Sequence, residues 1–288
     1  MLVDDPTVGD EVRAARSRLE RAGIAGPDAE LLAAWAAGSS AGEIRVDIAM
    51  GRRFPADAVA RFRRAVDRRE AREPLQHITG VAPFRHVELR VGPGVFTPRP
   101  ETELLVEVAL DHVRGMREPM VLDVGTGSGA VGIALAQEAG ARVVAVELSP
   151  AAFVWARRNI ASLAPGIVLL HADARDPAAL SAVGVQPGSL AALVSNPPYV
   201  PHAAIPADVE VRGFDPAGAL YSGADGLDFV RDLAPLAADL VAPGGIVAFE
   251  HAEHQSAAIR VMLEDAGFHR ARTHRDLTGR DRVTSAIR

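Results

Sequence analysis

The sequence predicts an α/β protein in which a doubly wound, mostly parallel sheet follows a small helical N-terminal domain. Segments with strand character and segments with helix character alternate from Met120 onward. The strand segments are continuous apolar runs, which is typical of strands buried on both faces of a sheet. Residues 7–72, by contrast, show only helical periodicity and are rich in arginine. These patterns favour a helical domain followed by a sheet that helices cover on both faces.

Three helices are expected in the N-terminal region. The first has apolar residues at helical spacing, at Val8, Val12, Ala15 and Leu19. The second follows Pro27, which suits a helix start, and its expected buried face is Leu31, Leu32 and Trp35. The third begins at Pro55, and its expected buried face is Val59, Phe62 and Val66.

The opposite face of the third helix is basic, with arginines at Arg61, Arg64, Arg68 and Arg69. A run of like charges on a helix is most often a solvated face, and we favour that interpretation. The alternative is a contact surface for a macromolecular partner.

The chain changes character after residue 73, which we interpret as a domain boundary. Residues 74–80 are predicted to form a turn-rich connector, and residues 84–91 alternate apolar and polar side chains as a short hairpin would. The sequence Gly92-Pro93-Gly94 interrupts this pattern. The expected division is a helical domain over 1–82, a hairpin and linker over 83–95, and a larger domain over 96–288.

The larger domain is expected to begin with a helix through Leu104–Leu110. Five strands are then predicted, over 121–123, 143–147, 167–171, 190–195 and 246–250. Helices are expected between them near 130–139, 151–162 and 226–241. The tail is predicted to contain a helix near 255–266 and two strands, 269–273 and 282–287, that pair antiparallel around Thr278-Gly279.

The composition excludes several kinds of chemistry. The 288 residues include no cysteine, and every basic residue other than histidine is arginine. Disulfides, thiolate nucleophiles and Schiff-base lysines are therefore excluded. The net charge of −6 does not draw the whole protein to nucleic acid or to a membrane. No apolar run could span a bilayer, and residues 1–5 lack a signal-peptide pattern, so we expect a cytoplasmic protein.

A glycine-rich loop follows the first strand of the larger domain. It reads Asp123-Val124-Gly125-Thr126-Gly127-Ser128-Gly129 and opens a helix. Glycines permit a tight turn and the close approach of a ligand to the backbone. A dinucleotide-binding loop would show Gly-x-Gly-x-x-Gly, whereas here the spacing is Gly-x-Gly-x-Gly.

Acidic residues end the next two strands. Glu147 lies where an acid binds ribose hydroxyls in nucleotide-binding α/β folds, although a strand end is also an ordinary place for a charge. Asp173 could accept a hydrogen bond from an adenine amino group, with the backbone N–H of Ala174 beside it. We expect these groups at one edge of the sheet, because open α/β sheets bind ligands at the carboxyl ends of their strands.

The fourth strand ends in Asn196-Pro197-Pro198-Tyr199. A strand cannot continue through two prolines, because each lacks a backbone N–H. The Asn196 side chain and the carbonyl groups beside the prolines can accept the two hydrogens of a planar NH2 group, and Tyr199 adds a flat ring. A proline-rich turn without function is the simpler interpretation of an isolated Asn-Pro pair.

The glycine loop resembles the first motif of S-adenosylmethionine-dependent methyltransferases, and with Asn196-Pro197-Pro198-Tyr199 it resembles enzymes that methylate adenine or glutamine. Three further segments are similar to the release factor glutamine methyltransferase family, known as PrmC or HemK: residues 74–80, 96–103 and 276–282. This resemblance implies a Rossmann-like class I methyltransferase sheet with a small helical substrate-binding domain. It also implies methylation at N5 of the glutamine in the Gly-Gly-Gln loop of peptide chain release factors.

The resemblance implies a role for each motif residue. The cofactor S-adenosylmethionine would be bound by Asp123, Gly125, Thr126, Gly127, Ser128, Gly129, Glu147, Asp173, Ala174 and Asn196. The substrate would be bound by Asn196, Pro197, Pro198, Tyr199, Phe96, Pro98 and Arg99, and the catalytic groups among these would be Asn196, Pro197 and Tyr199. Ala252 departs from the family, which often has glycine at that place. We expect no metal, because His251 and His254 have no third ligand near them in the sequence.

Other functions remain open from the residues alone. The same chemistry could act on a ribosomal-protein glutamine or on adenine N6, although an adenine enzyme working on DNA needs a basic recognition region. A nicotinamide-dependent oxidoreductase is disfavoured by the glycine spacing, and a non-catalytic binding module by the intact motifs. The expected partners are release factors, contacted through the helical domain by a monomer, with no stable nucleic acid and no membrane.

Overall fold

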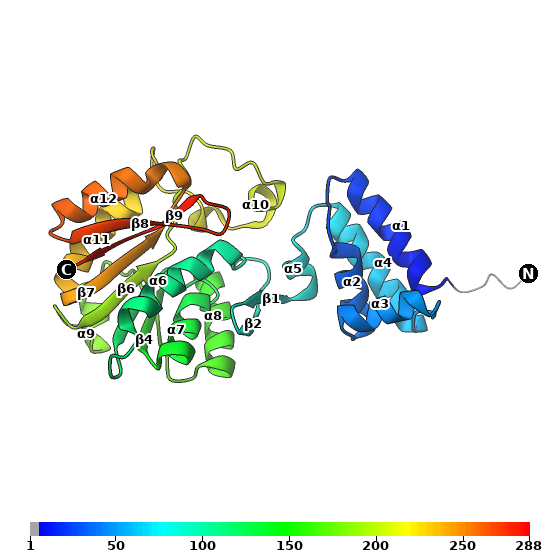
Figure 1. The fold of residues 1–288 in the computed structure, drawn as a ribbon, viewed down its shortest axis with the longest axis horizontal. Coiled ribbons are helices and arrows are strands. Elements are labelled where there is room, and N and C mark those ends of the chain that lie inside the picture. Colours follow the sequence, from blue (N-terminus) through cyan, green and yellow to red (C-terminus); the bar gives the residue numbers. More distant parts are fainter. Residues whose placement is uncertain (1–5) are drawn as a thin grey trace, which may run out of the picture. The chain divides into compact units, whose positions relative to one another are not determined.

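The computed structural model describes residues 6–288, which divide into two compact units (Figure 1). The first unit extends as far as Gly80 and also includes Ala207–Phe214. The second comprises Val81–Pro206 and Asp215–Arg288. Residues 1–5, where the sequence showed no signal-peptide pattern, lie outside the described residues. The inclusion of 207–214 in the first unit was not foreseen from the sequence.

The named elements of the first unit, within the described residues, are all helices, and an isolated antiparallel bridge joins Thr7 to Arg53. These helices are α1 Val8–Arg21, α2 Asp28–Ala37, α3 Ala41–Ala49, α4 Ala56–Glu70, α5 Leu75–Thr79 and α10 Val209–Phe214. Helices α1, α2 and α4 lie where they were predicted, whereas α3 and α10 were not predicted. The turn-rich connector expected over 74–80 is instead the short helix α5. This helix follows Pro74 and ends at Gly80, which has a φ of 78°.

The buried face of α2 differs from the prediction. Leu32 is buried, but Leu31 and Trp35 are only half-buried. The rest of the buried surface consists of alanines, at Ala29, Ala33, Ala34 and Ala36. This helix packs against α1, α3 and α4, and small side chains allow three neighbouring helices to approach it.

The basic face of α4 is not uniformly solvated, contrary to the favoured interpretation. Arg69 is only 9% exposed, and its guanidinium group binds Asp28 at 2.7 Å and Glu210 at 2.8 Å. Arg72, which follows the helix, binds the same Glu210 carboxylate at 2.6 Å. The burial of Arg69 requires these acidic partners, because an unpaired buried charge is costly.

Glu210 fixes α10 within the helical unit. Burial acts to raise its pKa, but hydrogen bonds from Arg69 and Arg72 lower that pKa to about 2. The carboxylate is therefore ionised at neutral pH and holds two arginines. Through it, a segment from the middle of the larger domain's sequence is bound to the N-terminal helices.

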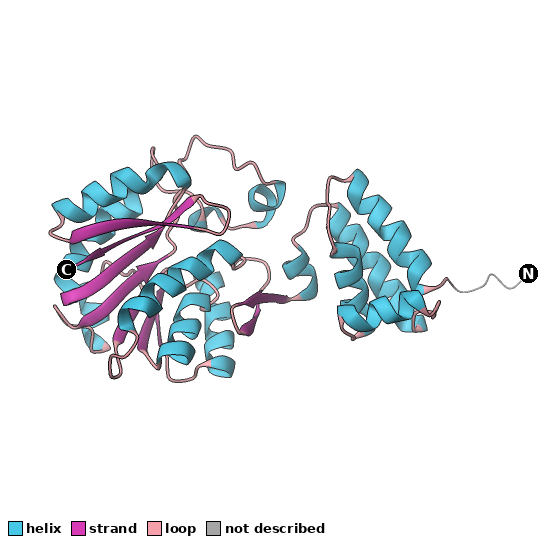
Figure 2. Ribbon diagram, in the orientation of Figure 1, coloured by secondary structure: helices cyan, strands magenta, loops and turns pink. Residues whose placement is uncertain are grey.

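The second unit contains a seven-stranded sheet of order β5-β4-β3-β6-β7-β9-β8 (Figure 2). Its strands are β3 Met120–Val124, β4 Arg142–Glu147, β5 Val168–His171, β6 Leu190–Ser195, β7 Val241–Glu250, β8 His269–Arg275 and β9 Asp281–Ile287. The first five in spatial order are parallel. Strand β9 pairs antiparallel with β7, and β8 pairs antiparallel with β9. A separate hairpin pairs β1 Val81–Phe84 with β2 Val87–Arg90. The predicted fold class is confirmed.

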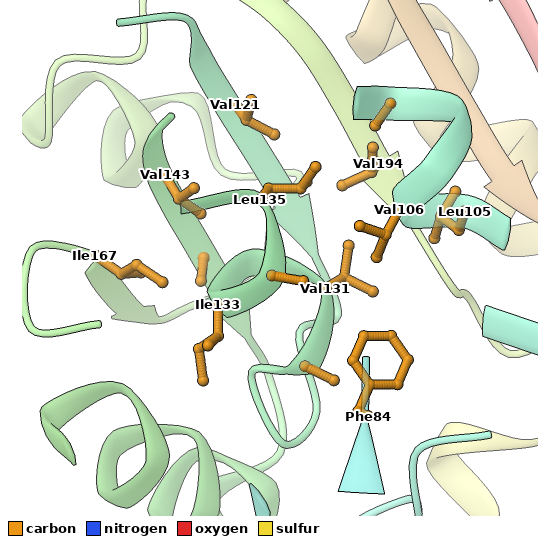
Figure 3. Close-up of a cluster of buried hydrophobic side chains, with 14 of the residues drawn as sticks. Phe84, Leu105, Val106, Val121, Val131, Ile133, Leu135, Val143, Ile167 and Val194 are labelled. Carbon is orange, nitrogen blue, oxygen red and sulfur yellow. The ribbon is translucent and has the colours of Figure 1, made fainter. Parts of the chain in front are cut away.

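Helices cover both faces of the sheet. Those on one face are α6 Glu103–Val113, α7 Ala130–Ala139 and α8 Pro150–Leu163, and those on the other are α9 Pro177–Ala182, α11 Asp228–Leu240 and α12 Ser256–Asp265. Short 3-10 helices are η1 Pro100–Thr102, η2 Ala217–Ala219 and η3 Glu253–Gln255. Successive strand residues point to opposite faces, so Val121 joins the core cluster drawn in Figure 3 and Leu122 joins the cluster on the other face of the sheet. Among residues 6–288, no helix has the length and apolar character needed to cross a bilayer.

The Glu210 ion pairs predict a pH-dependent effect on stability. Because the pKa of Glu210 is depressed in the folded chain, its contribution is fully present above about pH 4.5 and is lost as the pH falls toward 2. We expect Glu210→Gln to lower the melting temperature at pH 7 and to have a smaller effect at pH 3. Calorimetry at both pH values measures this, with Glu20→Gln on the exposed face of α1 as the control. Equal effects of Glu210→Gln at both pH values would contradict the assignment.

Candidate active site

The register of the parallel strands brings the predicted motifs to one edge of the sheet. Val124 in β3 lies level with Val146 in β4 and with Ser195 in β6. Ser195 in turn lies level with Phe249 in β7. The residues that follow these positions therefore form a row at the carboxyl ends of the strands: Glu147, Gly125, Asn196 and Glu250. This is the edge at which open α/β sheets bind ligands.

The glycine-rich loop presents an open backbone surface. Gly125, Gly127 and Gly129 all have positive φ, at 69°, 58° and 87°. A Cβ added to Gly125 would meet no described atom within 4 Å, and one added to Gly127 would meet only a backbone oxygen at 4.0 Å. The loop is held from behind, since the N–H groups of Gly125 and Thr126 donate to the carbonyl of Val146. The residues present thus fit a ligand lying against the backbone.

Asp123 lies beneath this loop rather than on its open surface. Its side chain is buried, and Oδ2 accepts hydrogen bonds from the Thr126 hydroxyl at 2.6 Å and from Gly132 N–H at 3.0 Å. Burial raises the pKa of Asp123 to about 6, the two hydrogen bonds lower it, and the nearby Glu147 raises it. Asp123 therefore stabilises the conformation of the glycine loop through Thr126 and Gly132.

Glu147 connects the end of β4 to the glycine loop. One carboxylate oxygen accepts the N–H of Gly127 at 2.8 Å, and the other accepts the N–H of Ser149 at 2.8 Å. The predicted ribose-binding acid is thus held in a fixed orientation beside the loop. Lone pairs remain on both oxygens for a ligand, since a carboxylate can accept about four hydrogen bonds.

Asp173 and Ala174 follow β5, the next strand along the edge. The guanidinium group of Arg175 binds the Asp173 carboxylate at 2.8 Å and lowers its pKa. Arg175 also binds Asp232 at 2.8 Å. Ala174 is buried in the core on the α11 side. Asp173 is thereby ionised and oriented at the strand end, although no pattern in the sequence indicated its arginine partner.

Asn196 begins the proline-rich turn after β6. Its Nδ2 donates to the hydroxyl of Thr102 at 3.2 Å, and no described residue donates a hydrogen bond to its Oδ1. The preceding Ser195 donates to the carbonyl of Val124 at 2.7 Å, which fixes the end of β6 against β3. Pro197 is buried and Pro198 is half-buried. The carboxamide oxygen of Asn196 is thus the acceptor that remains available.

Tyr199 is held by contacts from distant parts of the chain. Its backbone carbonyl accepts from the Gln255 side chain at 3.0 Å. Gly226 lies against the same carbonyl, since a Cβ added there would be 2.2 Å from the oxygen. Burial raises the pKa of the Tyr199 hydroxyl, and the nearby Glu250 raises it further. The phenol is therefore neutral at physiological pH.

The segment 96–99 contributes an aromatic and a basic group. The guanidinium carbon of Arg99 lies 5.4 Å from the ring centre of Phe96, a cation–π distance. Arg99 also binds the buried carboxylate of Asp215 at 3.0 Å. Pro98, which stands between Phe96 and Arg99 in the sequence, is half-buried. Arg99 is consequently committed to an internal ion pair, which the sequence did not predict.

Three residues at this edge were not singled out from the sequence. Thr102 lies inside the segment 96–103, and Glu250 ends the predicted strand 246–250. Only these positions could have indicated from the sequence that the two residues belong to the site. Asn159 had no local signal: it is buried in α8, and its Nδ2 donates to the carbonyl of Ser128 at 2.8 Å. Thr102 and Asn159 each hydrogen-bond a partner that is distant in sequence.

His251 takes part in strand pairing. Its ring nitrogens lie 2.9 Å from the carbonyl of Ala252 and 2.8 Å from the hydroxyl of Thr284 on β9. Within residues 6–288, no group of three or more histidine and acidic side chains is arranged to hold a metal ion.

Gly226 offers a test of the turn that carries Tyr199. Its φ is 81°, and an added Cβ would also lie 2.6 Å from the Gln255 side chain. We expect Gly226→Ala to lower the free energy of unfolding by about 1–3 kcal/mol, because both the backbone and the contact are strained. Urea unfolding measures this. Gly218→Ala, where a Cβ meets no described atom within 4 Å, is the control, and equal stability of the two variants would contradict the expectation.

Solved methyltransferases share the fold of the second unit. A methyltransferase from Pyrococcus furiosus superposes with a TM-score of 0.51 at 20% identity, over 69% of this chain and 87% of that chain. The T. thermophilus 16S rRNA N2 G1207 methyltransferase gives a TM-score of 0.52 at 23% identity, over 72% of this chain and 49% of that chain. A family described as "Methyltransferase domain" matches residues 121–196, which extend from β3 to Asn196.

Sequence relatives extend over the whole chain, and the family "PrmC N-terminal domain" matches residues 11–80. Release factor glutamine methyltransferase of Streptomyces coelicolor is 46% identical over 96% of both chains. The protein of that name from Corynebacterium glutamicum is 43% identical over 97% of this chain and 98% of its own. That from Mycobacterium tuberculosis H37Rv is 36% identical over 98% and 92%. The chain therefore belongs to the release factor glutamine methyltransferase family.

Proposed function

We propose that this enzyme transfers the methyl group of S-adenosylmethionine to N5 of the glutamine in the Gly-Gly-Gln motif of peptide chain release factors. The observation that supports this most is the position of Asn196. Its carboxamide directly follows β6, the strand beside the one that leads into the glycine loop, with Nδ2 bound to Thr102 and Oδ1 available. An acceptor beside a cofactor loop suits a substrate whose reacting atom is an uncharged NH2 nitrogen.

The proposed cofactor site is built from the loop and the two acidic strand ends. The open surface of Gly125, Gly127 and the intervening Thr126 would lie against the methionine part of the cofactor, with Ser128 and Gly129 completing the turn. Glu147 would accept the ribose hydroxyls with lone pairs that Gly127 and Ser149 leave unused. Asp173 and the backbone of Ala174 would bind the adenine. The cofactor supplies a methyl group already activated by the positive sulfur.

The proposed substrate site lies at Asn196-Pro197-Pro198-Tyr199. Oδ1 of Asn196 and the carbonyl of Pro197 would accept the two amide hydrogens, while the neutral Tyr199 ring would pack on the amide plane. Phe96 and Pro98 would line the glutamine pocket. Arg99, being paired with Asp215, would support this lining rather than contact the glutamine directly.

The chemical difficulty is the nucleophile, because a carboxamide lone pair is delocalised into the carbonyl group. Two acceptors on the NH2 hydrogens orient that lone pair and stabilise the positive charge that develops on nitrogen. The nitrogen would take the methyl carbon as its bond to sulfur breaks, and the surplus amide proton would then pass to water. Positioning and fixed dipoles therefore account for the catalysis, and no strong base is required for the attack.

The substrate is the part of the proposal that most needs a direct experiment. Labelled methyl donor is incubated with the enzyme and a release factor, and with the same release factor whose loop glutamine is replaced. Label only in the first reaction supports the proposal. Label on a ribosomal protein or on adenine in DNA, with none on the release factor, would favour the alternative substrates. Calorimetry with S-adenosylmethionine and with NAD separates a methyltransferase from an oxidoreductase.

Removal of the Asn196 side chain should slow the chemical step. We expect Asn196→Ala to reduce the single-turnover rate of methyl transfer to a release factor by about 10²-fold or more, as for loss of one preorganised polar group. Equilibrium dialysis measures the affinity for S-adenosylmethionine, and the rates are compared at saturating cofactor so that any loss of binding is separated from the loss of rate. A rate near that of the wild type would exclude the proposed role of Asn196.

Loss of Glu147 should weaken the cofactor site. This carboxylate orients the loop through Gly127 and is proposed to bind the ribose. Charge-assisted hydrogen bonds are worth about 1.5–3 kcal/mol, so Glu147→Ala is expected to raise the dissociation constant of S-adenosylmethionine about 10- to 100-fold. Titration calorimetry measures this, with the exposed Glu264→Ala in α12 as the matched control. Unchanged affinity in Glu147→Ala would argue against the ribose contact.

A further inference from the structure

The end of β7 carries a buried carboxyl group to which no step above assigns a role. Glu250 is 1% exposed, and its Oε2 has no hydrogen-bond partner within the part of the chain that the structure describes. Since Ser195 and Phe249 are level in β6 and β7, Glu250 follows directly beside Asn196. A buried carboxyl that lacks full hydrogen bonding is costly, so its place next to Asn196 calls for an explanation.

Thr102 connects the two residues. It is buried at the N-terminal end of α6, a position where a threonine hydroxyl ordinarily caps the helix. Here the hydroxyl makes no such cap and instead accepts the Nδ2 hydrogen of Asn196 at 3.2 Å. Thr102 also lies close enough to Glu250 to lower the pKa of that buried carboxyl group. Thr102 therefore lies between the asparagine and the buried carboxyl.

The two ends of the Asn196 carboxamide have nearly the same shape, so packing alone cannot choose between them. If the amide were flipped, an NH2 group would face the NH2 group of the glutamine. A hydroxyl alone does not prevent this, because it can both donate and accept. A hydroxyl whose single proton is given to a carboxylate can only accept, and it then selects the NH2 end of Asn196.

We propose that Glu250, acting through the Thr102 hydroxyl, orients the Asn196 carboxamide so that Oδ1 faces the substrate nitrogen. The direction of donation runs from Asn196 Nδ2–H to Thr102 Oγ1, and from Thr102 Oγ1–H to the Glu250 carboxylate. Glu250 and Thr102 are positioning residues, since neither is assigned a contact with the reacting atoms. The inference rests on the proposed glutamine transfer.

The ionisation of Glu250 should control this orientation. Burial raises its pKa to about 7, Thr102 lowers it, Glu101 in η1 raises it, and Arg282 in β9 and the Tyr199 hydroxyl lower it. The ionised form accepts the Thr102 proton. The protonated form donates to Thr102 instead, which leaves the threonine proton free to bind Oδ1 and permits the flipped amide. Methyl transfer should therefore become faster as the pH rises through about 7.

The first test replaces Thr102 in the full-length enzyme. Thr102→Val keeps the shape but removes the acceptor, and we expect the single-turnover rate of transfer to a release factor to fall about 10- to 100-fold. Thr102→Ser keeps the hydroxyl and should recover most of that rate. The KM values for both substrates should stay within about threefold of the wild type, which separates orientation from binding. A valine variant within twofold of the wild-type rate, or a serine variant as slow as valine, would overturn the proposal.

The second test measures the pH profile of the transfer rate in Glu250→Gln, with the exposed Glu253→Gln in η3 as the matched control. Glutamine has no carboxylate to hold the Thr102 proton at any pH, so the rate of this variant should stay low and show no inflection near pH 7. The wild type and the control should both show the inflection. A retained inflection in Glu250→Gln would refute the role of Glu250.

The two tests distinguish this inference from the proposed function. Failure of the wild type to methylate any release factor would remove the proposed function itself. Transfer by the wild type that is insensitive to the Thr102 and Glu250 variants would remove only the orienting role. Should Glu250→Gln fail to fold, as thermal unfolding would reveal, the comparison of valine and serine at Thr102 still decides the question.

Discussion

The site depends on the alignment of three parallel strands at their carboxyl ends. Hydrogen bonding sets Val124 level with Val146 on one side and with Ser195 on the other. The Ser195 hydroxyl adds a side-chain bond to the carbonyl of Val124. A shift of one residue in either pairing would reverse which face each following side chain meets. The glycine loop, the acid of β4 and the asparagine of β6 keep their mutual positions only in this register.

The same edge concentrates buried negative charge. Asp123 has a raised pKa because it is buried, with Glu147 nearby adding to that effect, and Glu250 is likewise buried and raised. Among the residues that the structure describes, no arginine forms an ion pair with either carboxylate. A cation arriving at this edge would favour the ionised forms, since an opposite charge offsets the cost of burial. This electrostatic character suits the sulfonium and the amino group of the proposed donor.

The chain between Tyr199 and Asp215 is held by ion pairs at separate points. Glu210 binds two arginines of the helical unit, and Asp215 binds Arg99. The buried partners make these pairs sensitive to loss of either member, because an unpaired charge would remain. Residues 207–214 are therefore held by ion pairs within the helical unit to which they belong.

The sequence by itself determined the elements whose signals are local. Continuous apolar runs located the strands of the parallel sheet, and the spacing of Gly125, Gly127 and Gly129 located the loop. Short helices such as α5 and α10 were not predicted, because a few residues carry too little periodicity to distinguish a helix from a turn. Residue type also could not reveal that Arg69 is buried, since its acidic partner Glu210 lies far along the chain.

Only the tertiary structure decided which polar groups work together. Thr102 and Glu250 meet Asn196 because a helix terminus and a neighbouring strand end converge there, and no spacing in the sequence encodes that meeting. Gln255 and Gly226 support Tyr199 for the same reason. Local patterns report what a segment can form, whereas hydrogen bonds between distant segments depend on how the elements pack.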